Sequence, residues 1–185
     1  MHEIEIKAAV RNKEGLVNKL AELGCVFSEA ITQDDTVYAK NVSSITEFVK
    51  NSLFLRIRAQ SNGKVIFTVK HHEGRDANDP TGVPVEHELE VSSRDTMEQM
   101  LMLLDFKEAA RVKKTRQKCL YKEWELCIDE VEGLGTFIEV EQMATFEEAE
   151  AIQKNIIDFL LSLGIEQNDI PAQRYDIALM EKSLA

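Results

Sequence analysis

The sequence lacks the long apolar segments found in membrane and exported proteins. None of its apolar runs approaches the roughly 20 residues that a helix needs to cross a bilayer. Its first residues also lack the basic stretch followed by an apolar one that marks a secretory signal. These absences predict a cytoplasmic protein without a membrane partner.

Cysteine is scarce, and its spacing excludes two kinds of stabilising site. The three cysteines, Cys25, Cys119 and Cys127, are an odd number and include no CxxC pair. Neither a disulfide framework nor a zinc knuckle is therefore indicated. We expect three free thiols that are buried or half-buried.

Basic residues are fewer than acidic ones. The 22 Lys and Arg residues stand against 33 Asp and Glu residues, which gives a formal net charge of −11. Such a surface should repel nucleic acid, so we expect no nucleic-acid partner. An anionic substrate would have to meet a local group of bases. The length of 185 residues, 44% of them hydrophobic, predicts a single domain over residues 1–185.

Charged residues alternate with apolar ones from the start of the chain. In HEIEIKAAV, the side chains of Glu3, Glu5 and Lys7 share one face of an expected strand, and Ile4 and Ile6 lie on the other. The same alternation predicts five further strands. These strands and their charged faces are 53–60 with Arg56 and Arg58, 64–70 with Lys64 and Lys70, 85–91 with Glu86, Glu88 and Glu90, 113–117 with Lys114 and Arg116, and 136–142 with Glu139 and Glu141.

Helical spacing of apolar residues separates these strands. We expect four helices, over residues 13–24, 94–106 and 145–164 and in a short segment that begins at Pro171. Residues 29–35 and 71–84 are expected to be loops. The pattern predicts an α+β fold that is mainly antiparallel β.

The charged strand faces allow two arrangements. In an open sheet they would face water, which is the common case and makes any single pair weak evidence. In a closed barrel they would line one polar lumen. There Glu3 and Glu5, roughly 6.6 Å apart by strand rise, would repel each other by on the order of 2 kcal/mol. Mg²⁺ or Mn²⁺ would suit the carboxylates, and phosphates would suit the clustered Lys and Arg residues.

Taken in order, these motifs resemble a known family. An N-terminal ExExK is followed by RxR, a strand-ending Lys, a central ExE, KxR and the string CIDEVEGLGTFIEVE. This set, from Glu3 to Glu141, resembles the CYTH superfamily of triphosphate tunnel metalloenzymes and is most similar to its class IV adenylyl cyclase branch. The resemblance implies an eight-stranded closed β-barrel with a charged lumen and helices packed outside. It also implies two divalent ions, Mg²⁺ or Mn²⁺, and a nucleoside or other triphosphate as substrate.

The resemblance further implies a role for each charged position. The metal ligands would be Glu3, Glu5, Asp129, Glu139 and Glu141. The triphosphate oxygens would be bound by Lys7, Arg56, Arg58, Lys70, Lys114 and Arg116. Glu86 and Glu88 would orient the bases or touch the second metal, and Lys7 would also act in catalysis. One departure is Arg174, which precedes Tyr175 where the family often has a small hydroxyl residue.

Three functions are compatible with these residues. The first is an adenylyl cyclase that converts ATP into cyclic AMP and pyrophosphate. The second is a triphosphatase for thiamine triphosphate, inorganic triphosphate or a nucleotide, and the third is a phosphate-binding domain without turnover. The third is the weakest, because both acidic strands and all the expected bases are intact. The first two functions share their phosphate-binding residues. A homodimer is compatible with the sequence.

Overall fold

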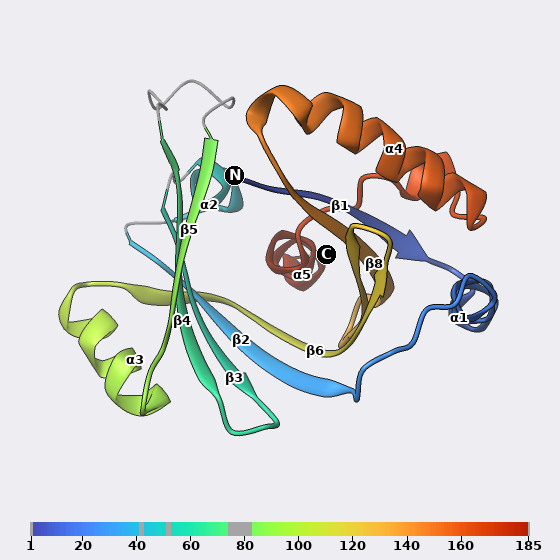
Figure 1. Ribbon diagram of the computed structural model, residues 1–185. Coiled ribbons are helices and arrows are strands. Elements are labelled where there is room, and N and C mark those ends of the chain that lie inside the picture. Colours follow the sequence, from blue (N-terminus) through green and yellow to red (C-terminus); the bar gives the residue numbers. More distant parts are fainter. Residues whose placement is uncertain (1, 41–42, 51–52, 74–82, 185) are drawn as a thin grey trace. The chain divides into compact units, whose positions relative to one another are not determined.

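The computed structural model describes residues 2–40, 43–50, 53–73 and 83–184 (Figure 1). The strands are β1 (His2–Val10), β2 (Ile31–Ala39), β3 (Leu53–Gln60), β4 (Val65–Glu73), β5 (Val83–Glu90), β6 (Lys107–Tyr121), β7 (Trp124–Val131) and β8 (Gly135–Ala144). The helices are α1 (Lys13–Glu22), α2 (Ile45–Lys50), α3 (Arg94–Leu103), α4 (Ala149–Ser162) and α5 (Tyr175–Leu184), with short 3₁₀ turns at η1 (Phe146–Glu148) and η2 (Gln167–Asp169).

The strands form one hydrogen-bonded order, β1-β8-β7-β6-β2-β3-β4-β5, and the ladders β1–β8, β2–β3, β3–β4, β4–β5, β6–β7 and β7–β8 are antiparallel. This confirms an eight-stranded antiparallel α+β fold. In the described residues, β1 and β5 stand at the two ends of the order, so the described ladders do not join them. The closed barrel therefore stays a prediction.

Contacts divide the chain into two compact units. The first is Met1–Ile31 with Lys114–Gln173, and the second is Thr32–Lys113 with Arg174–Ala185. β6 passes from the second unit into the first, so it belongs to both. Each unit is described by itself.

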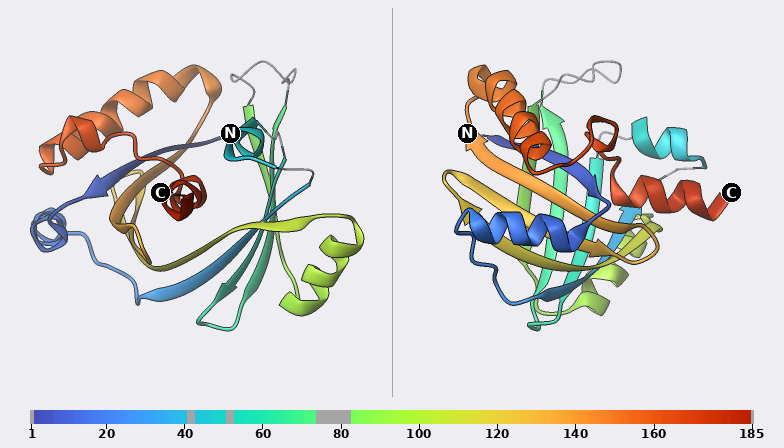
Figure 2. Two further views of the ribbon diagram at one scale, coloured as in Figure 1. Left: turned by 180° about the vertical axis from the view of Figure 1, so that it is seen from behind. Right: turned by 90° about the vertical axis from the view of Figure 1, so that its right-hand side faces the viewer.

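In the first unit, α1 and α4 cover the apolar face of the strands (Figures 1 and 2). The alternation in β1 explains why: Ile4 and Ala8 are buried in the core, whereas Glu3 and Glu5 are exposed. Trp124 is buried in the same core, where its ring centroid lies 4.9 Å from that of Phe159 on α4. The charges of these strands therefore lie on the face opposite the two helices.

In the second unit, helices cover both faces of the strands. Leu55 and Ile57 of β3 form a core with Leu101 of α3. Val37 of β2 points to the other face and packs in a cluster with Ile177 of α5. This second cluster differs from the expectation that helices pack only outside. α5 carries apolar residues that bury part of the face on which the charges lie.

Several sequence-based boundaries were wrong, among them the strand expected over 113–117, which is part of the longer β6 (Lys107–Tyr121). Residues 31–35 belong to β2 rather than to a loop, because Gln33 and Asp35 are buried despite their polarity. β4 extends to Glu73 and β5 begins at Val83, so only residues 74–82 of the expected 71–84 loop lie outside the described residues. The last helix begins at Tyr175 rather than at Pro171, and the six-residue α2 was not expected.

The helices are short, and α4 has 14 residues. Among the residues that the structure describes, none of the helices combines the length and apolarity required to traverse a bilayer.

The neighbours Leu160 and Leu161 on α4 offer a matched test of this core. Leu160 is fully buried and Leu161 is 36% exposed. Leu160→Ala should lower the free energy of unfolding by about 2–5 kcal/mol, because it leaves a cavity between α4 and the strands. Leu161→Ala should cost less than about 1 kcal/mol. Urea unfolding of both variants measures the difference, and equal losses would contradict the described packing of α4.

Candidate active site

The charged face of the first unit is organised by strand register. Lys7 and Glu139 are directly opposite each other on β1 and β8, as are Glu5 and Glu141. Across the β6–β7 ladder, Asp129 is opposite Arg116. Because side chains alternate along a strand, the register sets the acids and bases of four strands on one face.

Glu139 is the centre of this face. Its carboxylate is buried and forms one ion pair with Lys7, at 2.9 Å, and a second with Arg116. Burial alone would raise the pKa of Glu139, but the positive charges of Arg116, Lys7 and Lys114 outweigh it and hold the pKa well below its usual value. Glu139 is therefore a fixed anion that compensates three bases.

Asp129 has a similar environment. It is fully buried, and the guanidinium of Arg116 donates to its two oxygens at 2.6 and 2.5 Å. Lys114 donates to the same carboxylate at 2.8 Å. Both oxygens that a metal would need are thus engaged by bases of β6.

Glu3, Glu5 and Glu141 form an acidic group, in which Glu141 is the next residue after Glu139 on the charged face of β8. One oxygen from each lies within 4.8 Å of the others, a spacing at which a single cation can be held. Burial and the negative charges of Glu139 and Glu3 raise the pKa of Glu141 to about 7. Carboxylate oxygens are the ligands that Mg²⁺ and Mn²⁺ prefer, so this group fits the metals that the sequence predicts.

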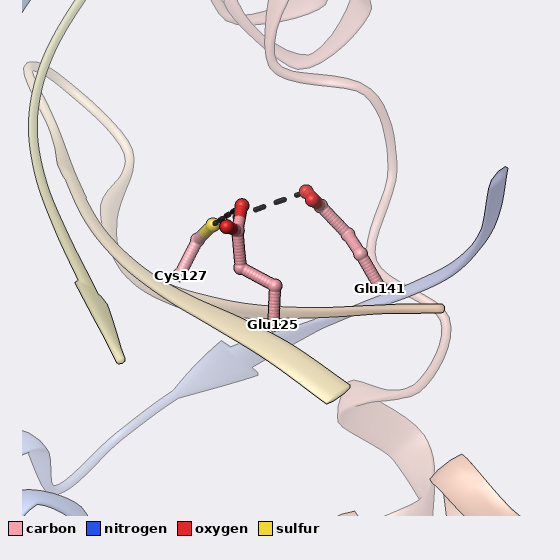
Figure 3. Close-up of side chains that lie close together, drawn as sticks. All are labelled: Glu125, Cys127 and Glu141. Atoms are coloured by element: carbon pink, nitrogen blue, oxygen red, sulfur yellow. Dashed lines mark hydrogen bonds between the residues drawn. The ribbon is translucent and has the colours of Figure 1, made fainter. Parts of the chain in front are cut away.

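A second group shares Glu141 and was not identified from the sequence. Figure 3 shows Glu125 and Cys127 of β7 converging with Glu141, and the Cys127 thiol donates to both carboxylates at 3.9 Å. Burial raises the pKa of Cys127, and Lys118 donates to Glu125 at 2.5 Å. A neutral thiol and a paired carboxylate fit a hard divalent ion less well than three carboxylates do. The alternation ELCID could have placed both residues on the charged face.

The second unit carries a separate group of bases on β3 and β4. Arg56 donates to Thr68 and to Glu88, both at 3.0 Å, and lies 3.5 Å from Glu86. Glu86 also pairs with Lys70 at 3.4 Å. The two glutamates that were expected either to orient bases or to touch metal thus contact bases in the structure.

Arg56 is a buried cation that lies close to a second cation, Arg58. Burial and the positive charge of Arg58 lower its pKa, although Asp35, Glu86 and Glu88 act in the opposite direction. Within the described part of the chain, its Nε atom is buried without a hydrogen-bond partner. An anionic ligand would relieve both conditions.

Sequence reasoning missed Asp35, which it placed in a solvated loop. Asp35 is buried on β2 and accepts two hydrogen bonds from Arg58, at 2.7 and 2.8 Å. The available signal was the period-two spacing of Gln33, Asp35 and Val37, which puts the three side chains on one face of a strand. Arg174, the departure noted in the sequence, lies with its guanidinium 5.0 Å from the Phe54 ring and 5.6 Å from the Phe48 ring and pairs with Asp176.

The structure therefore places the expected site residues in two groups. The first unit holds Glu3, Glu5, Lys7, Lys114, Arg116, Asp129, Glu139 and Glu141. The second unit holds Arg56, Arg58, Lys70, Glu86 and Glu88.

The raised pKa of Glu141 predicts a pH-dependent loss of stability. The folded protein keeps this proton at pH values where an unfolded carboxyl, with an ordinary pKa of 4.5, has lost it. Raising the pH from about 5 to about 7 should therefore destabilise the metal-free protein, by on the order of 2–3 kcal/mol from this group. The lowered pKa of Glu139 acts at lower pH, below this window.

Glu141→Gln removes the titration, so the stability of the variant relative to the unchanged protein should rise across this pH range. Urea unfolding at several pH values, without divalent metal, measures the difference. A difference that stays constant with pH would contradict the described environment of Glu141.

Comparison with known proteins identifies the family. The CYTH domain model matches residues 1–175. A protein of Methanocaldococcus jannaschii named "Putative adenylate cyclase MJ0240" is 28% identical over 176 residues, which are 95% of this chain and 97% of that protein.

Solved structures with the same fold include two that cover nearly the whole chain. The PH1819 protein of Pyrococcus horikoshii OT3 superposes with a TM-score of 0.77 at 26% identity, over 98% of this chain and 99% of that one. "Putative adenylyl cyclase HpAC1" from Hippeastrum, described as revealing a dominant triphosphatase activity, gives a TM-score of 0.62 at 19% identity, over 98% and 96% of the two chains. With a family model that spans residues 1–175, the chain belongs to the CYTH domain family.

Proposed function

We propose that this chain is a class IV type adenylyl cyclase that uses two Mg²⁺ or Mn²⁺ ions to convert ATP into cyclic AMP and pyrophosphate. Membership of the CYTH family supports an enzyme that acts on a triphosphate. The name of the Methanocaldococcus relative supports the cyclase reaction. The closed barrel with a charged lumen is part of this proposal.

One observation carries the proposal: three carboxylates that fit a divalent ion adjoin a buried row of bases. Glu141 belongs to the acidic group and lies 4.0 Å from Arg116, which itself pairs with Glu139. Phosphoryl transfer requires positioning and charge stabilisation more than covalent help from the protein. Such a reaction needs carboxylates that bind metal next to basic side chains that bind phosphate, and this face has both.

In this assignment, Glu3, Glu5 and Glu141 hold metal. The ions, when bound, neutralise phosphate oxygens and the charge that develops on them. Lys7 and Arg116 bind phosphate oxygens, and Glu139 holds both bases in place through its ion pairs. A triphosphate brings about four negative charges, which the bases and metals together must offset.

The bases of the second unit, Arg56, Arg58 and Lys70, are proposed as further phosphate ligands. The buried Nε of Arg56 supports this role, because a buried donor without a partner is costly. Glu86 and Glu88 keep Arg56 and Lys70 in place.

A triphosphatase is the second candidate. The Hippeastrum structure, which shares this fold, is described as having a dominant triphosphatase activity. The two reactions differ in the nucleophile: the ribose 3′-oxygen attacks the α-phosphorus in a cyclase, and water attacks the terminal phosphorus in a triphosphatase. The phosphate-binding residues serve either reaction.

Product analysis decides between them. The protein is incubated with ATP or tripolyphosphate and Mg²⁺ or Mn²⁺, and cyclic AMP, pyrophosphate and orthophosphate are separated by chromatography. Cyclic AMP and pyrophosphate in equal amounts would support the cyclase. Orthophosphate from both substrates would identify a triphosphatase, and no product from either would contradict both and favour a binding domain.

Glu5→Gln should abolish turnover without loss of the fold. Glu5 is exposed, so removing its charge relieves repulsion with Glu141 and does not create a cavity. We expect at least about a 100-fold fall in kcat from the lost metal contact. Glu22→Gln, at an exposed position of α1, is the control and should keep the full rate. A rate near that of the unchanged protein in Glu5→Gln at saturating Mg²⁺ would exclude this metal assignment.

Lys7→Ala should lower kcat more than it raises KM. Lys7 follows Glu5 on the charged face of β1 and shares Glu139 with Arg116, so we expect its contact with phosphate to strengthen as charge shifts in the transition state. Glu139 keeps its ion pair with Arg116 in this variant, which should preserve the fold. Lys13→Ala on α1 is the charge-matched control. Steady-state kinetics that show a change in KM alone would remove Lys7 from the catalytic step.

A further inference from the structure

Each unit contains a buried aspartate directly opposite the second base of a base-x-base strand. Asp35 on β2 is opposite Arg58 of the pair Arg56 and Arg58. Asp129 on β7 is opposite Arg116 of the pair Lys114 and Arg116. Asp35 is 5% exposed and Asp129 is fully buried.

The two aspartates contact their bases in the same way. Arg58 donates through Nε and a terminal nitrogen to the two oxygens of Asp35, at 2.7 and 2.8 Å. Arg116 donates to Asp129 through the same two kinds of nitrogen. In both cases the first base of the pair is also near the carboxylate: Arg56 lies 3.9 Å from Asp35, and Lys114 lies 2.8 Å from Asp129.

A bidentate ion pair fixes an arginine more completely than a single contact does. It sets the plane of the guanidinium as well as the position of its charge. A free arginine side chain loses rotamer entropy when it is ordered. If a buried carboxylate orders the side chain beforehand, phosphate binding does not bear that loss.

We propose that Asp35 and Asp129 are positioning residues, which hold the guanidinium groups of Arg58 and Arg116 in the orientation that binds triphosphate. This inference rests on the proposed function, in which these bases are phosphate ligands. It gives Asp129 a role other than the metal ligand that family resemblance implies, because the oxygens of Asp129 are engaged by Lys114 and Arg116.

The sign of one substitution separates this role from a purely electrostatic one. Asp35→Asn removes a negative charge next to bases that are to bind an anion. If Asp35 only neutralised Arg58, the substitution would strengthen phosphate binding. If Asp35 positions Arg58, the substitution weakens binding even though the site becomes more positive.

Asp34 provides a matched control on the same strand. It points to the other face of β2 and accepts a bidentate ion pair from Arg111, at 2.8 and 2.5 Å. Asp34→Asn changes the net charge of the chain by the same amount and breaks an ion pair of the same kind. It leaves Arg58 and its surroundings as they are.

The experiment is calorimetric titration of the full chain with tripolyphosphate at fixed ionic strength and saturating Mg²⁺. Asp35→Asn should raise the Kd about 10-fold, and Asp34→Asn should change it less than about twofold. In an Arg58→Lys background, which lacks the fork, Asp35→Asn should have little further effect. Thermal unfolding of each variant shows whether it is folded at the assay temperature.

Unchanged or tighter binding by folded Asp35→Asn would overturn the inference and leave the proposed function intact. If the unchanged protein binds no tripolyphosphate, the inference and the proposed function both fail. If Asp35→Asn does not fold, Asp35→Glu replaces it, because it keeps the charge but displaces the carboxylate by one methylene. Positioning predicts weaker binding by that variant, and unchanged binding would again overturn the inference.

Discussion

The ion pairs of Glu139 are the interaction on which the charged face of the first unit depends. A buried carboxylate is costly unless it is paired, and an unpaired buried guanidinium or ammonium is costly in the same way. Glu139 and Asp129 together offset the charges of three bases, Lys7 on β1 and Lys114 and Arg116 on β6. Loss of Glu139 would leave Lys7 and Arg116 partly uncompensated and would act on the fold as well as on the chemistry. Its role thus differs from that of Glu5, an exposed acid in the same expected set.

This network also explains why the acids of the face are not equivalent. Burial favours the protonated form of both glutamates, but the cations around Glu139 outweigh it and lower that pKa, whereas burial and the neighbouring carboxylates together raise the pKa of Glu141. Two glutamates that are two residues apart on one strand therefore carry opposite tendencies to hold a proton. The strand register contributes to this difference, because it sets Lys7 opposite Glu139 and Glu5 opposite Glu141. Glu141 adjoins Glu3 and Glu5, and these three acids together can hold a cation.

Much of the fold could be predicted from period-two alternation, which identified β1, β3, β4, β5, β8 and the middle of β6, and the face that each charge occupies. β2 was missed because burial of Gln33 and Asp35 depends on partners far away in the sequence, notably Arg58. The short α2 lacks a second turn of apolar repeat, so its sequence shows little periodicity. The candidate site was predictable where the motif carried charge, but Glu125, Cys127 and Asp35 were not singled out. Their roles follow from cross-strand neighbours, which only the register defines.

β6 has a consequence for how the chain can tolerate insertions. Its 15 residues run without interruption from Lys107 to Tyr121, and its last part supplies Lys114 and Arg116. One residue inserted just before Lys114 would turn both bases to the opposite side of the strand and bring Thr115 and Gln117 to the charged side. Two inserted residues would keep each side chain on its own face and only move the bases along the ladder. Length variation in this strand should therefore be restricted to even numbers, or to bulges that absorb the extra residue.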